Sequence, residues 1–281
     1  MPTWLNEQVV GNGPASPKGD SLLIVEAGCQ EYEKYRLGHL PGAIYLDTNR
    51  FERAPDWNVA PPTELERVLL AHGITSEKPT LLYGRDPLAV ARIALVLLYA
   101  GVEEVRWLAG GIEAWIAGGN ALETGARVPN PAQAFGKTIP AHPEYIVDSS
   151  QVRVLLADPN AVVACVRTWE EFIGKASGYN YIEPKGRIAG SVWAGQPDFE
   201  VRQYTPGDTL ERTLHRCQEV AANWRGRGIT PEKHIVFYCG TGWRASQAFL
   251  CAWLMGWKDI SIYDGGWLEW SADPKNPIEG G

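Results

Sequence analysis

The feature that most constrains the fold of this chain is a diverged internal repeat. Three short patterns from the first half recur in the same order, at nearly constant spacing, in the second half. They are Gly38-His39-Leu40-Pro41-Gly42-Ala43-Ile44 with Gly186-Arg187-Ile188-Ala189-Gly190-Ser191-Val192, Leu81-Leu82-Tyr83-Gly84 with Val236-Phe237-Tyr238-Cys239, and Gly110-Gly111 before Trp115 with Gly265-Gly266 before Trp270. Several matches near one offset indicate a duplicated unit. The 281 residues are also long enough for two domains of ordinary size.

Each half alternates short apolar runs with segments of helical periodicity. This alternation is typical of α/β proteins, in which a parallel sheet carries helices on both faces. In the first half we expect strands at 22–26, 80–83 and 105–108 and helices at 63–71 and 88–99, the first helix opened by a capping box of Thr63 and Glu66. In the second half we expect strands at 161–165, 234–238 and 260–263 and helices at 210–225 and 245–255. The sequence therefore predicts two tandem α/β domains.

A proline-rich segment separates the two halves. Residues 123–143 include Pro129, Pro131, Pro140 and Pro143, and proline removes a backbone donor and disfavours helix. We therefore expect an extended linker at 123–141, between a first domain at 1–122 and a second domain at 142–281.

Charge and hydropathy exclude several classes of partner. The net charge is −7, the isoelectric point is about 5.4, and no run of Lys or Arg stands out, so neither nucleic acid nor an anionic membrane is an expected partner. No apolar stretch reaches the ~18 residues of a transmembrane helix, and residues 1–20 lack the basic start and apolar core of a signal peptide. We expect a cytoplasmic protein, or a periplasmic one if a leader has been removed.

The five cysteines do not form a metal-binding or disulfide pattern. They are Cys29, Cys165, Cys217, Cys239 and Cys251. Their number is odd and no C-x-x-C spacing occurs, which leaves at least one free thiol and predicts no zinc site. Four of them fit a packed core, whereas the context of Cys239 points to chemistry.

The chemical site is expected in the loop 239–244, which joins the strand 234–238 to the following helix. The loop reads Cys239-Gly240-Thr241-Gly242-Trp243-Arg244. Ligands of parallel sheets bind at the carboxyl ends of the strands. The two glycines allow successive N–H groups to point inward, and such a nest beside a helix N-terminus binds an anion and favours a thiolate on Cys239. Thr241 adds a hydroxyl donor, Trp243 forms a wall of the pocket, and Arg244 supplies a planar cation for an oxyanion.

In these patterns the chain resembles the rhodanese family of sulfurtransferases. The resemblance covers nearly the whole chain, as two tandem rhodanese domains, and rests on the repeated patterns 38–44 and 186–192, the loop 239–244 and the segment 263–267. It implies that the Cys239 thiolate takes the outer sulfur of a small anionic donor such as thiosulfate. The loop then holds the persulfide until a thiol or cyanide acceptor removes that sulfur. It also implies that no metal or organic cofactor is required. Lys185 and Arg187 are further candidates for donor binding.

The N-terminal domain is expected to be inactive. Gly84 stands where Cys239 stands in the second half, so the nucleophile is missing. Pro87 has no N–H for the anion nest, Asp86 places a negative charge there, and Ala89 replaces Arg244.

Several alternatives remain open at this point. The mercaptopyruvate sulfurtransferases of the family carry a carboxylate-binding Arg where this chain has Glu171, and a glutamate repels a carboxylate, which favours thiosulfate. Arg167 is expected to pair with Glu170 or Glu171. The protein could instead be a persulfide carrier in a sulfur relay that serves an acceptor protein. A Cys-based phosphatase or arsenate reductase is less compatible, because those anion loops hold one more residue between Cys and Arg than this one does.

Overall fold

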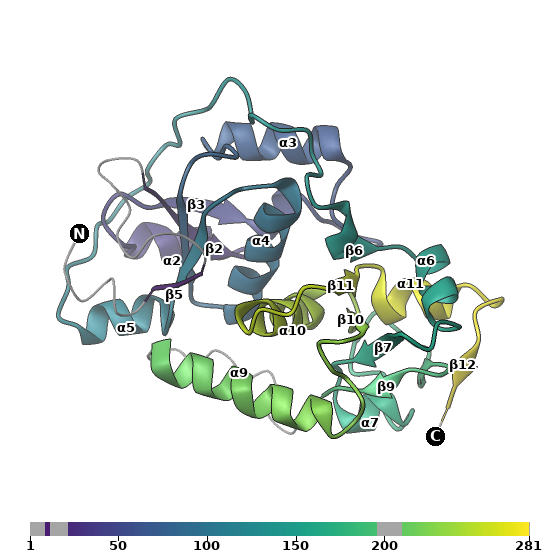
Figure 1. Cartoon of the computed structure of the whole chain (residues 1–281). Coiled ribbons are helices and arrows are strands. Elements are labelled where there is room, and N and C mark those ends of the chain that lie inside the picture. Colours follow the sequence, from purple (N-terminus) through teal and green to yellow (C-terminus); the bar gives the residue numbers. More distant parts are fainter. Residues whose placement is uncertain (1–8, 12–21, 196–209, 281) are drawn as a thin grey trace. The chain divides into compact units, whose positions relative to one another are not determined.

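The structure, a computed structural model, describes residues 9–11, 22–195 and 210–280 (Figure 1). These residues form two compact units. The first comprises mainly residues 22–53 and 59–142, and the second mainly residues 143–195 and 215–280. Most of the N-terminal segment 1–20, which we interpreted as lacking a signal peptide, lies outside the described residues. None of the described helices is long and apolar enough to cross a membrane.

The first unit contains a five-stranded sheet with the order β1-β5-β4-β2-β3. Its strands are β1 (Val9–Gly11), β2 (Leu23–Gly28), β3 (Ile44–Asp47), β4 (Thr80–Gly84) and β5 (Val105–Leu108). Its helices are α2 (Tyr32–Leu37), α3 (Pro62–Ala71), α4 (Pro87–Ala100) and α5 (Gly111–Ala117), with the 3₁₀ turn η2 (Thr48–Arg50). Four strands are parallel, and only β1 runs antiparallel, on the outer side of β5. Helix α4 packs on β2, β4 and β5.

The second unit repeats this plan with a fully parallel sheet of order β6-β11-β10-β7-β9. The strands are β6 (Ile146–Val147), β7 (Ala161–Cys165), β9 (Val192–Trp193), β10 (His234–Tyr238) and β11 (Ile260–Tyr263). The helices are α6 (Ser149–Leu155), α7 (Trp169–Phe172), α9 (Leu210–Arg225), α10 (Trp243–Leu254) and α11 (Gly266–Ala272), with the 3₁₀ turn η3 (Pro143–Tyr145). A small separate sheet pairs β8 (Arg187–Ile188) with β12 (Ile278–Glu279).

Helices cover both faces of the second sheet. On one face Cys165 and Tyr238 pack in a cluster with Trp270 of α11. Because successive residues of a strand point to opposite faces, Phe237 points the other way, where its ring lies 4.9 Å from that of Trp224 of α9. The prediction of two α/β domains with parallel sheets and helices on both faces is therefore confirmed.

The repeated patterns occupy equivalent places in the two sheets. The strands β5-β4-β2-β3 of the first unit correspond to β11-β10-β7-β9 of the second. One contact recurs at the same point: Leu40 N–H donates to the Tyr83 hydroxyl at 3.0 Å, and Ile188 N–H donates to the Tyr238 hydroxyl at 3.2 Å. In both units the central strand thus anchors the loop that carries the pattern 38–44 or 186–192.

The segment expected as a linker lies along the first unit. Ala132 N–H donates to the Leu70 carbonyl at 2.9 Å, and Ser76 N–H donates to the Phe135 carbonyl at 2.8 Å. The Phe135 side chain is buried. The prolines keep the segment extended, while one aromatic side chain and these backbone bonds hold it to the domain that it follows.

The structure also differs from expectation at the start of α3. The helix begins at Pro62, with Pro61 in the capping position and no side-chain cap hydrogen bond. The capping box expected at Thr63 and Glu66 is therefore wrong. Proline is favoured in the first helical position because its fixed φ suits the helix and its N–H would have no partner there, so the capping position lies two residues before Thr63.

Candidate active site

Cys239 directly follows β10, the central strand of the second sheet, and is 1% exposed. Two backbone hydrogen bonds hold the start of its loop. Trp267 N–H donates to the Cys239 carbonyl at 2.7 Å, and Leu268 N–H donates to the Gly240 carbonyl at 3.1 Å. The first turn of α11 therefore uses donors that would otherwise lack partners to fix the loop that carries the thiol.

Glycine is required at two positions of the loop. Gly242 has a φ of +86° and stands immediately before α10, where its carbonyl accepts both the N–H and the hydroxyl of Ser246 at 2.8 Å. At Gly240, a Cβ would lie 2.2 Å from Cζ of Tyr179. Thr241 is buried, as is most of the loop, and only Trp243 is partly exposed.

Arg244 forms a buried two-pronged ion pair with Glu171 of α7. Its Nη1 donates to Oε2 and its Nη2 to Oε1, both at 2.9 Å, and the two side chains are 9% and 3% exposed. The same carboxylate accepts the Thr168 N–H at 2.9 Å and so completes a capping box of α7. Burial acts to raise the pKa of Glu171, but the hydrogen bonds and the charge of Arg244 outweigh it, so the pKa lies below its ordinary value. The charge of the loop arginine is thus balanced inside the protein.

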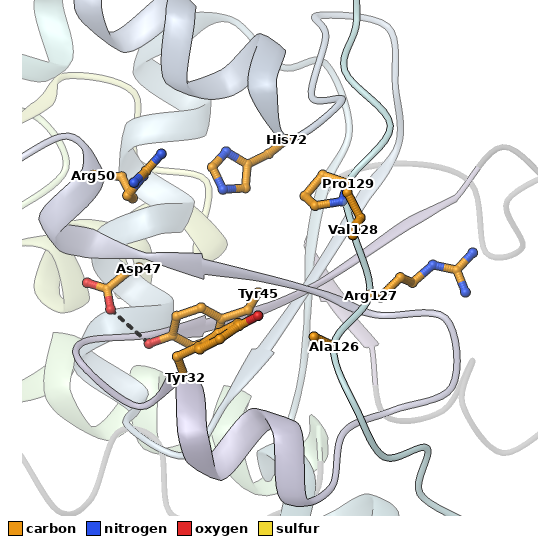
Figure 2. Close-up of a pocket in the computed structure, with 9 residues that line it drawn as sticks. All are labelled: Tyr32, Tyr45, Asp47, Arg50, His72, Ala126, Arg127, Val128 and Pro129. Carbon is orange, nitrogen blue, oxygen red and sulfur yellow. Dashed lines mark hydrogen bonds between the residues drawn. The ribbon is translucent and has the colours of Figure 1, made fainter.

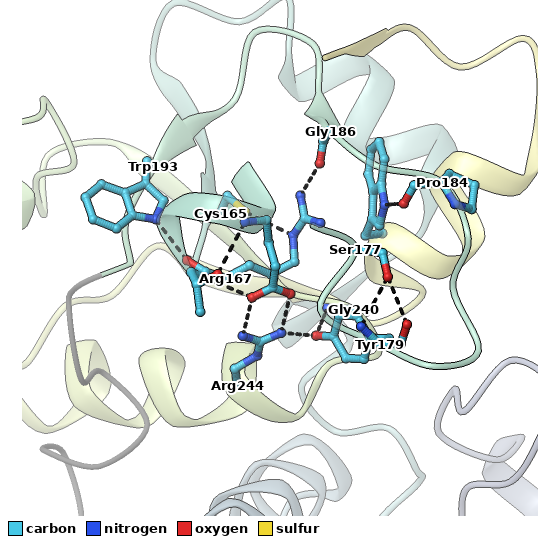
Figure 3. A network of polar contacts seen from close by, with 12 residues as sticks. Cys165, Arg167, Ser177, Tyr179, Pro184, Gly186, Trp193, Gly240 and Arg244 are labelled. Atoms are coloured by element: carbon cyan, nitrogen blue, oxygen red, sulfur yellow. Dashed lines mark hydrogen bonds and ion pairs between the residues drawn. The ribbon is translucent and has the colours of Figure 1, made fainter. Parts of the chain in front are cut away.

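Tyr179 closes the loop from the side (Figure 3). Its hydroxyl oxygen accepts the Gly240 N–H at 2.9 Å and a second hydrogen bond from Nη2 of Arg244. The guanidinium carbon of Arg244 also lies 5.2 Å from the centre of the Tyr179 ring. Burial, followed by the charge of Cys239, raises the pKa of Tyr179, which therefore keeps its proton. Sequence reasoning missed this residue, although it lies in a segment beside the repeated pattern 186–192.

The two further cations proposed for donor binding lie in different surroundings. Lys185 is exposed. Arg187 pairs with Glu279 at 2.7 Å, and its guanidinium lies 4.7 Å from the centre of the Phe172 ring. A role for Arg187 in donor binding would therefore require its pair with Glu279 to open.

Arg167 has partners other than the carboxylates expected for it. Its side chain is buried and donates to the Gly186 carbonyl at 2.6 Å and to Sγ of Cys165 at 3.3 Å (Figure 3). Its guanidinium also lies 4.9 Å from the centre of the Trp267 ring. Arg167 thus holds the loop before β8 in place, and Glu171, one of the two glutamates expected to pair with it, pairs with Arg244.

The comparison with known proteins agrees with this geometry. Residues 18–118 and 148–273 match the Rhodanese-like domain family. The chain belongs to the rhodanese family. It is 43% identical over 284 residues to the thiosulfate sulfurtransferase YnjE of Escherichia coli K12, a match that covers 100% of this chain and 64% of YnjE.

Two solved structures resemble this rhodanese chain closely. The crystal structure of YnjE has a TM-score of 0.85 and 42% identity, over 94% of this chain and 64% of that one. The anaerobic ergothioneine biosynthesis enzyme of Chlorobium limicola, in complex with trimethyl histidine, has a TM-score of 0.85 and 36% identity, over 94% of this chain and 66% of that one. The present chain thus spans slightly less than two thirds of the length of these relatives.

The N-terminal rhodanese domain has no room for a nucleophile at the equivalent position. A Cβ at Gly84 would lie 2.5 Å from the Ala27 carbonyl oxygen and 2.8 Å from a methyl carbon of Val90. Asp86 accepts the Leu88 N–H at 2.8 Å and so caps α4, whose first residue is proline. The Asp86 carboxylate therefore occupies the N-terminus of α4, where an anion would otherwise bind.

A hollow of about 440 Å³ lies elsewhere in the N-terminal rhodanese domain (Figure 2). Tyr32, Tyr45, Arg50 and His72 contribute to its lining. The carboxylate of Asp47 is occupied there by the Tyr45 hydroxyl at 3.0 Å and by two backbone N–H groups. No cysteine lines this hollow. Within the described ranges, no group of three His, Cys, Asp or Glu side chains is arranged to hold a metal ion.

The ion pair of Glu171 predicts a pH-dependent contribution to stability. Because its pKa is depressed in the folded protein, the charged form stabilises the fold above the ordinary value of 4.5, and this contribution is lost as the pH falls through the lower folded-state value. Glu171→Gln should lower the free energy of unfolding by about 3 kcal/mol at pH 7. The difference from wild type should shrink as the pH falls below 4.5, as measured by urea unfolding.

The exposed neighbour provides a control, since Glu170→Gln should change stability by less than about 0.5 kcal/mol. An equal loss for Glu171→Gln at all pH values would contradict the assignment.

Restoring a cysteine in the first domain should not restore chemistry. In a Cys239→Ser background, Gly84→Cys should lower the free energy of unfolding by about 1–3 kcal/mol, because the new Cβ overlaps the Ala27 carbonyl. No sulfur transfer above that background is expected. Thermal unfolding and a thiosulfate–cyanide assay measure the two effects, with Ala126→Cys at an exposed site as the control. Measurable turnover by the Gly84→Cys chain would show that the domain retains a working anion nest.

Proposed function

We propose that the protein is a sulfurtransferase that carries sulfane sulfur as a persulfide on Cys239. One observation carries most weight: a cysteine ends the central strand of a parallel sheet, and the next backbone N–H in its loop, at Gly240, binds the Tyr179 hydroxyl and not another backbone group. This hydrogen bond holds a hydroxyl, which is itself a hydrogen-bond donor, against the peptide that follows Cys239. The loop lies before the N-terminus of α10, whose dipole favours negative charge.

The proposed reaction has two displacements at Cys239. The thiolate attacks the outer sulfur of thiosulfate, a new S–S bond forms, and the old S–S bond breaks with its electron pair leaving on sulfite. The persulfide then carries one negative charge, which the loop N–H groups of 241–243 stabilise. An acceptor nucleophile attacks the outer sulfur, and the thiolate leaves. With cyanide the second product is thiocyanate, and with a thiol it is a persulfide of the acceptor.

The donor that we propose is thiosulfate or another small anionic sulfane compound. Arg244 is engaged by Glu171 and Tyr179, so the anion is bound mainly by the loop N–H groups and the Thr241 hydroxyl. The exposed ammonium of Lys185 adds attraction at longer range. A carboxylate-bearing donor such as 3-mercaptopyruvate fits less well, because position 171 offers a paired carboxylate in place of a cation.

The acceptor can belong to one of three chemical classes. A small thiol or cyanide suits the double displacement, and an acceptor protein would make the chain a carrier in a sulfur relay. The likeness to the ergothioneine biosynthesis enzyme adds the imidazole of trimethyl histidine as a further acceptor. We propose the small thiol as the main acceptor and a cytoplasmic location, where a reducing milieu keeps all five cysteines as free thiols.

The first test of the proposed function is sulfur loading. Incubation with thiosulfate should add one sulfur atom to the intact wild-type protein, measured by mass spectrometry, and none to Cys239→Ser. The other four cysteines, changed to Ser one at a time, are the controls and should each keep the gain. Adding cyanide, a small thiol or trimethyl histidine to the loaded protein then identifies the acceptor by loss of that sulfur. Loading that persists in Cys239→Ser would overturn the proposal, and release only to a protein partner would make the chain a carrier.

The second test compares donors. We expect kcat/KM with thiosulfate to exceed that with 3-mercaptopyruvate by tenfold or more, equivalent to about 1.4 kcal/mol of transition-state binding. The physical reason is that Arg244 already has a carboxylate partner and the pair carries no net charge. Steady-state kinetics with one acceptor and both donors measure the ratio. A higher kcat/KM for mercaptopyruvate would contradict this assignment of the donor.

A further inference from the structure

The hydroxyl of Tyr179 lies against the peptide that follows Cys239. Its oxygen is 2.9 Å from N of Gly240, the nitrogen bonded to the Cys239 carbonyl carbon, and it also accepts from Arg244. A hydroxyl can accept two hydrogen bonds and donate one. Across the residues that the structure describes, the Tyr179 oxygen accepts these two hydrogen bonds and its proton is donated to no protein acceptor.

The ionisable groups that act on the pKa of this hydroxyl are Cys239, Arg244 of α10 and Glu171 of α7. Arg244 and Glu171 are paired to each other through both carboxylate oxygens, so their charges largely cancel. The sulfur of Cys239 is then the unbalanced anion of this group when it is ionised. Because the pKa of Tyr179 is raised, first by burial and then by the charge of Cys239, the phenol keeps the proton that a sulfur anion can accept.

We propose that Tyr179 donates a hydrogen bond from its hydroxyl to the sulfur anion on Cys239, first to the thiolate and then to the persulfide. Tyr179 is thereby a catalytic residue, while Arg244 and Glu171 are positioning residues that hold its oxygen. The role in the persulfide state rests on the proposed function, whereas the role toward the thiolate does not.

The two N–H donors make this hydroxyl a stronger donor than an isolated phenol. A group that accepts hydrogen bonds is polarised so that its own proton is donated more readily. A hydrogen bond to an ionised acceptor is also roughly twice as strong as one between neutral groups. The ion pair of Arg244 and Glu171 therefore acts on the sulfur through Tyr179.

The test is Tyr179→Phe, which removes the hydroxyl and keeps the ring. The first measurement is the rate at which iodoacetamide alkylates Cys239 as a function of pH, located by peptide mass spectrometry. The midpoint of this profile should move upward by about one pH unit, the size expected for loss of one charge-assisted hydrogen bond. The single-turnover rate of sulfur loading from thiosulfate should fall about tenfold at pH 7.

Tyr181→Phe is the matched control, since Tyr181 is a neighbouring and more exposed ring at 5.5 Å from that of Tyr179. It should leave the alkylation midpoint unchanged and the loading rate within about twofold of wild type.

A second variant keeps the proposal testable if Tyr179→Phe is poorly folded. Replacing Tyr179 with 3-fluorotyrosine makes the phenol a stronger donor and leaves its contacts in place, so the alkylation midpoint should move downward. An unchanged midpoint in a folded Tyr179→Phe protein, or in the fluorotyrosine protein, would overturn the proposal. The alkylation profile does not depend on sulfur transfer. A shifted midpoint in a protein that never loads sulfur would support the role of Tyr179 and contradict the proposed function. Normal sulfur loading with an unchanged midpoint would support the proposed function and contradict the role of Tyr179.

Discussion

The need to give a buried loop carbonyl a hydrogen-bond donor shapes both domains of this protein. In each domain an arginine donates to the carbonyl of the glycine that opens the repeated pattern. Arg85 reaches Gly38 at 2.6 Å, and Arg167 reaches Gly186 at 2.6 Å. The two arginines come from different places in the repeat, since Arg85 follows β4 whereas Arg167 follows β7. The two domains therefore make the same contact with arginines that follow different strands. In both, the loop carbonyl needs a hydrogen-bond donor at that point.

This difference in the source of the arginine has a consequence for the loop 239–244. The residue equivalent to Arg85 in the second domain is Gly240, two positions after the anchoring Tyr238. In the first domain Arg85 fills this place with a long side chain paired to Glu26. In the second domain Arg167 supplies the cation from the neighbouring strand, which allows position 240 to be a glycine. Only a glycine admits the Tyr179 ring there, since a Cβ would lie 2.2 Å from it. The position of this one arginine is therefore a main difference between the loops that follow β4 and β10.

Local sequence patterns predicted the central part of the fold and singled out Cys239 as a candidate nucleophile, but they did not predict the residues that pack around it. The strands at 105–108, 161–165, 234–238 and 260–263 have the bounds that we expected, because each is a short segment rich in apolar residues. The strands β6 and β9, with two residues each, are too short to give a pattern. The loop 239–244 is itself local, so its spacing could be recognised. Glu171 and Tyr179 lie 73 and 65 residues from Arg244, and no periodicity reports a pairing over such distances.

Glu171 shows why a residue type alone does not define a role. Considered by itself, a glutamate in this place repels a carboxylate and so excludes one class of donor. In the folded protein both carboxylate oxygens of Glu171 accept hydrogen bonds from Arg244 at 2.9 Å. An ion pair of this kind exerts little net field on a ligand. In the proposed site, two features then disfavour a carboxylate donor. Position 171 has no cation, and the Arg244 cation is already paired with Glu171. In the proposed site, discrimination between anions is therefore a property of the pair, and changing either member alone alters the charge beside the loop 239–244.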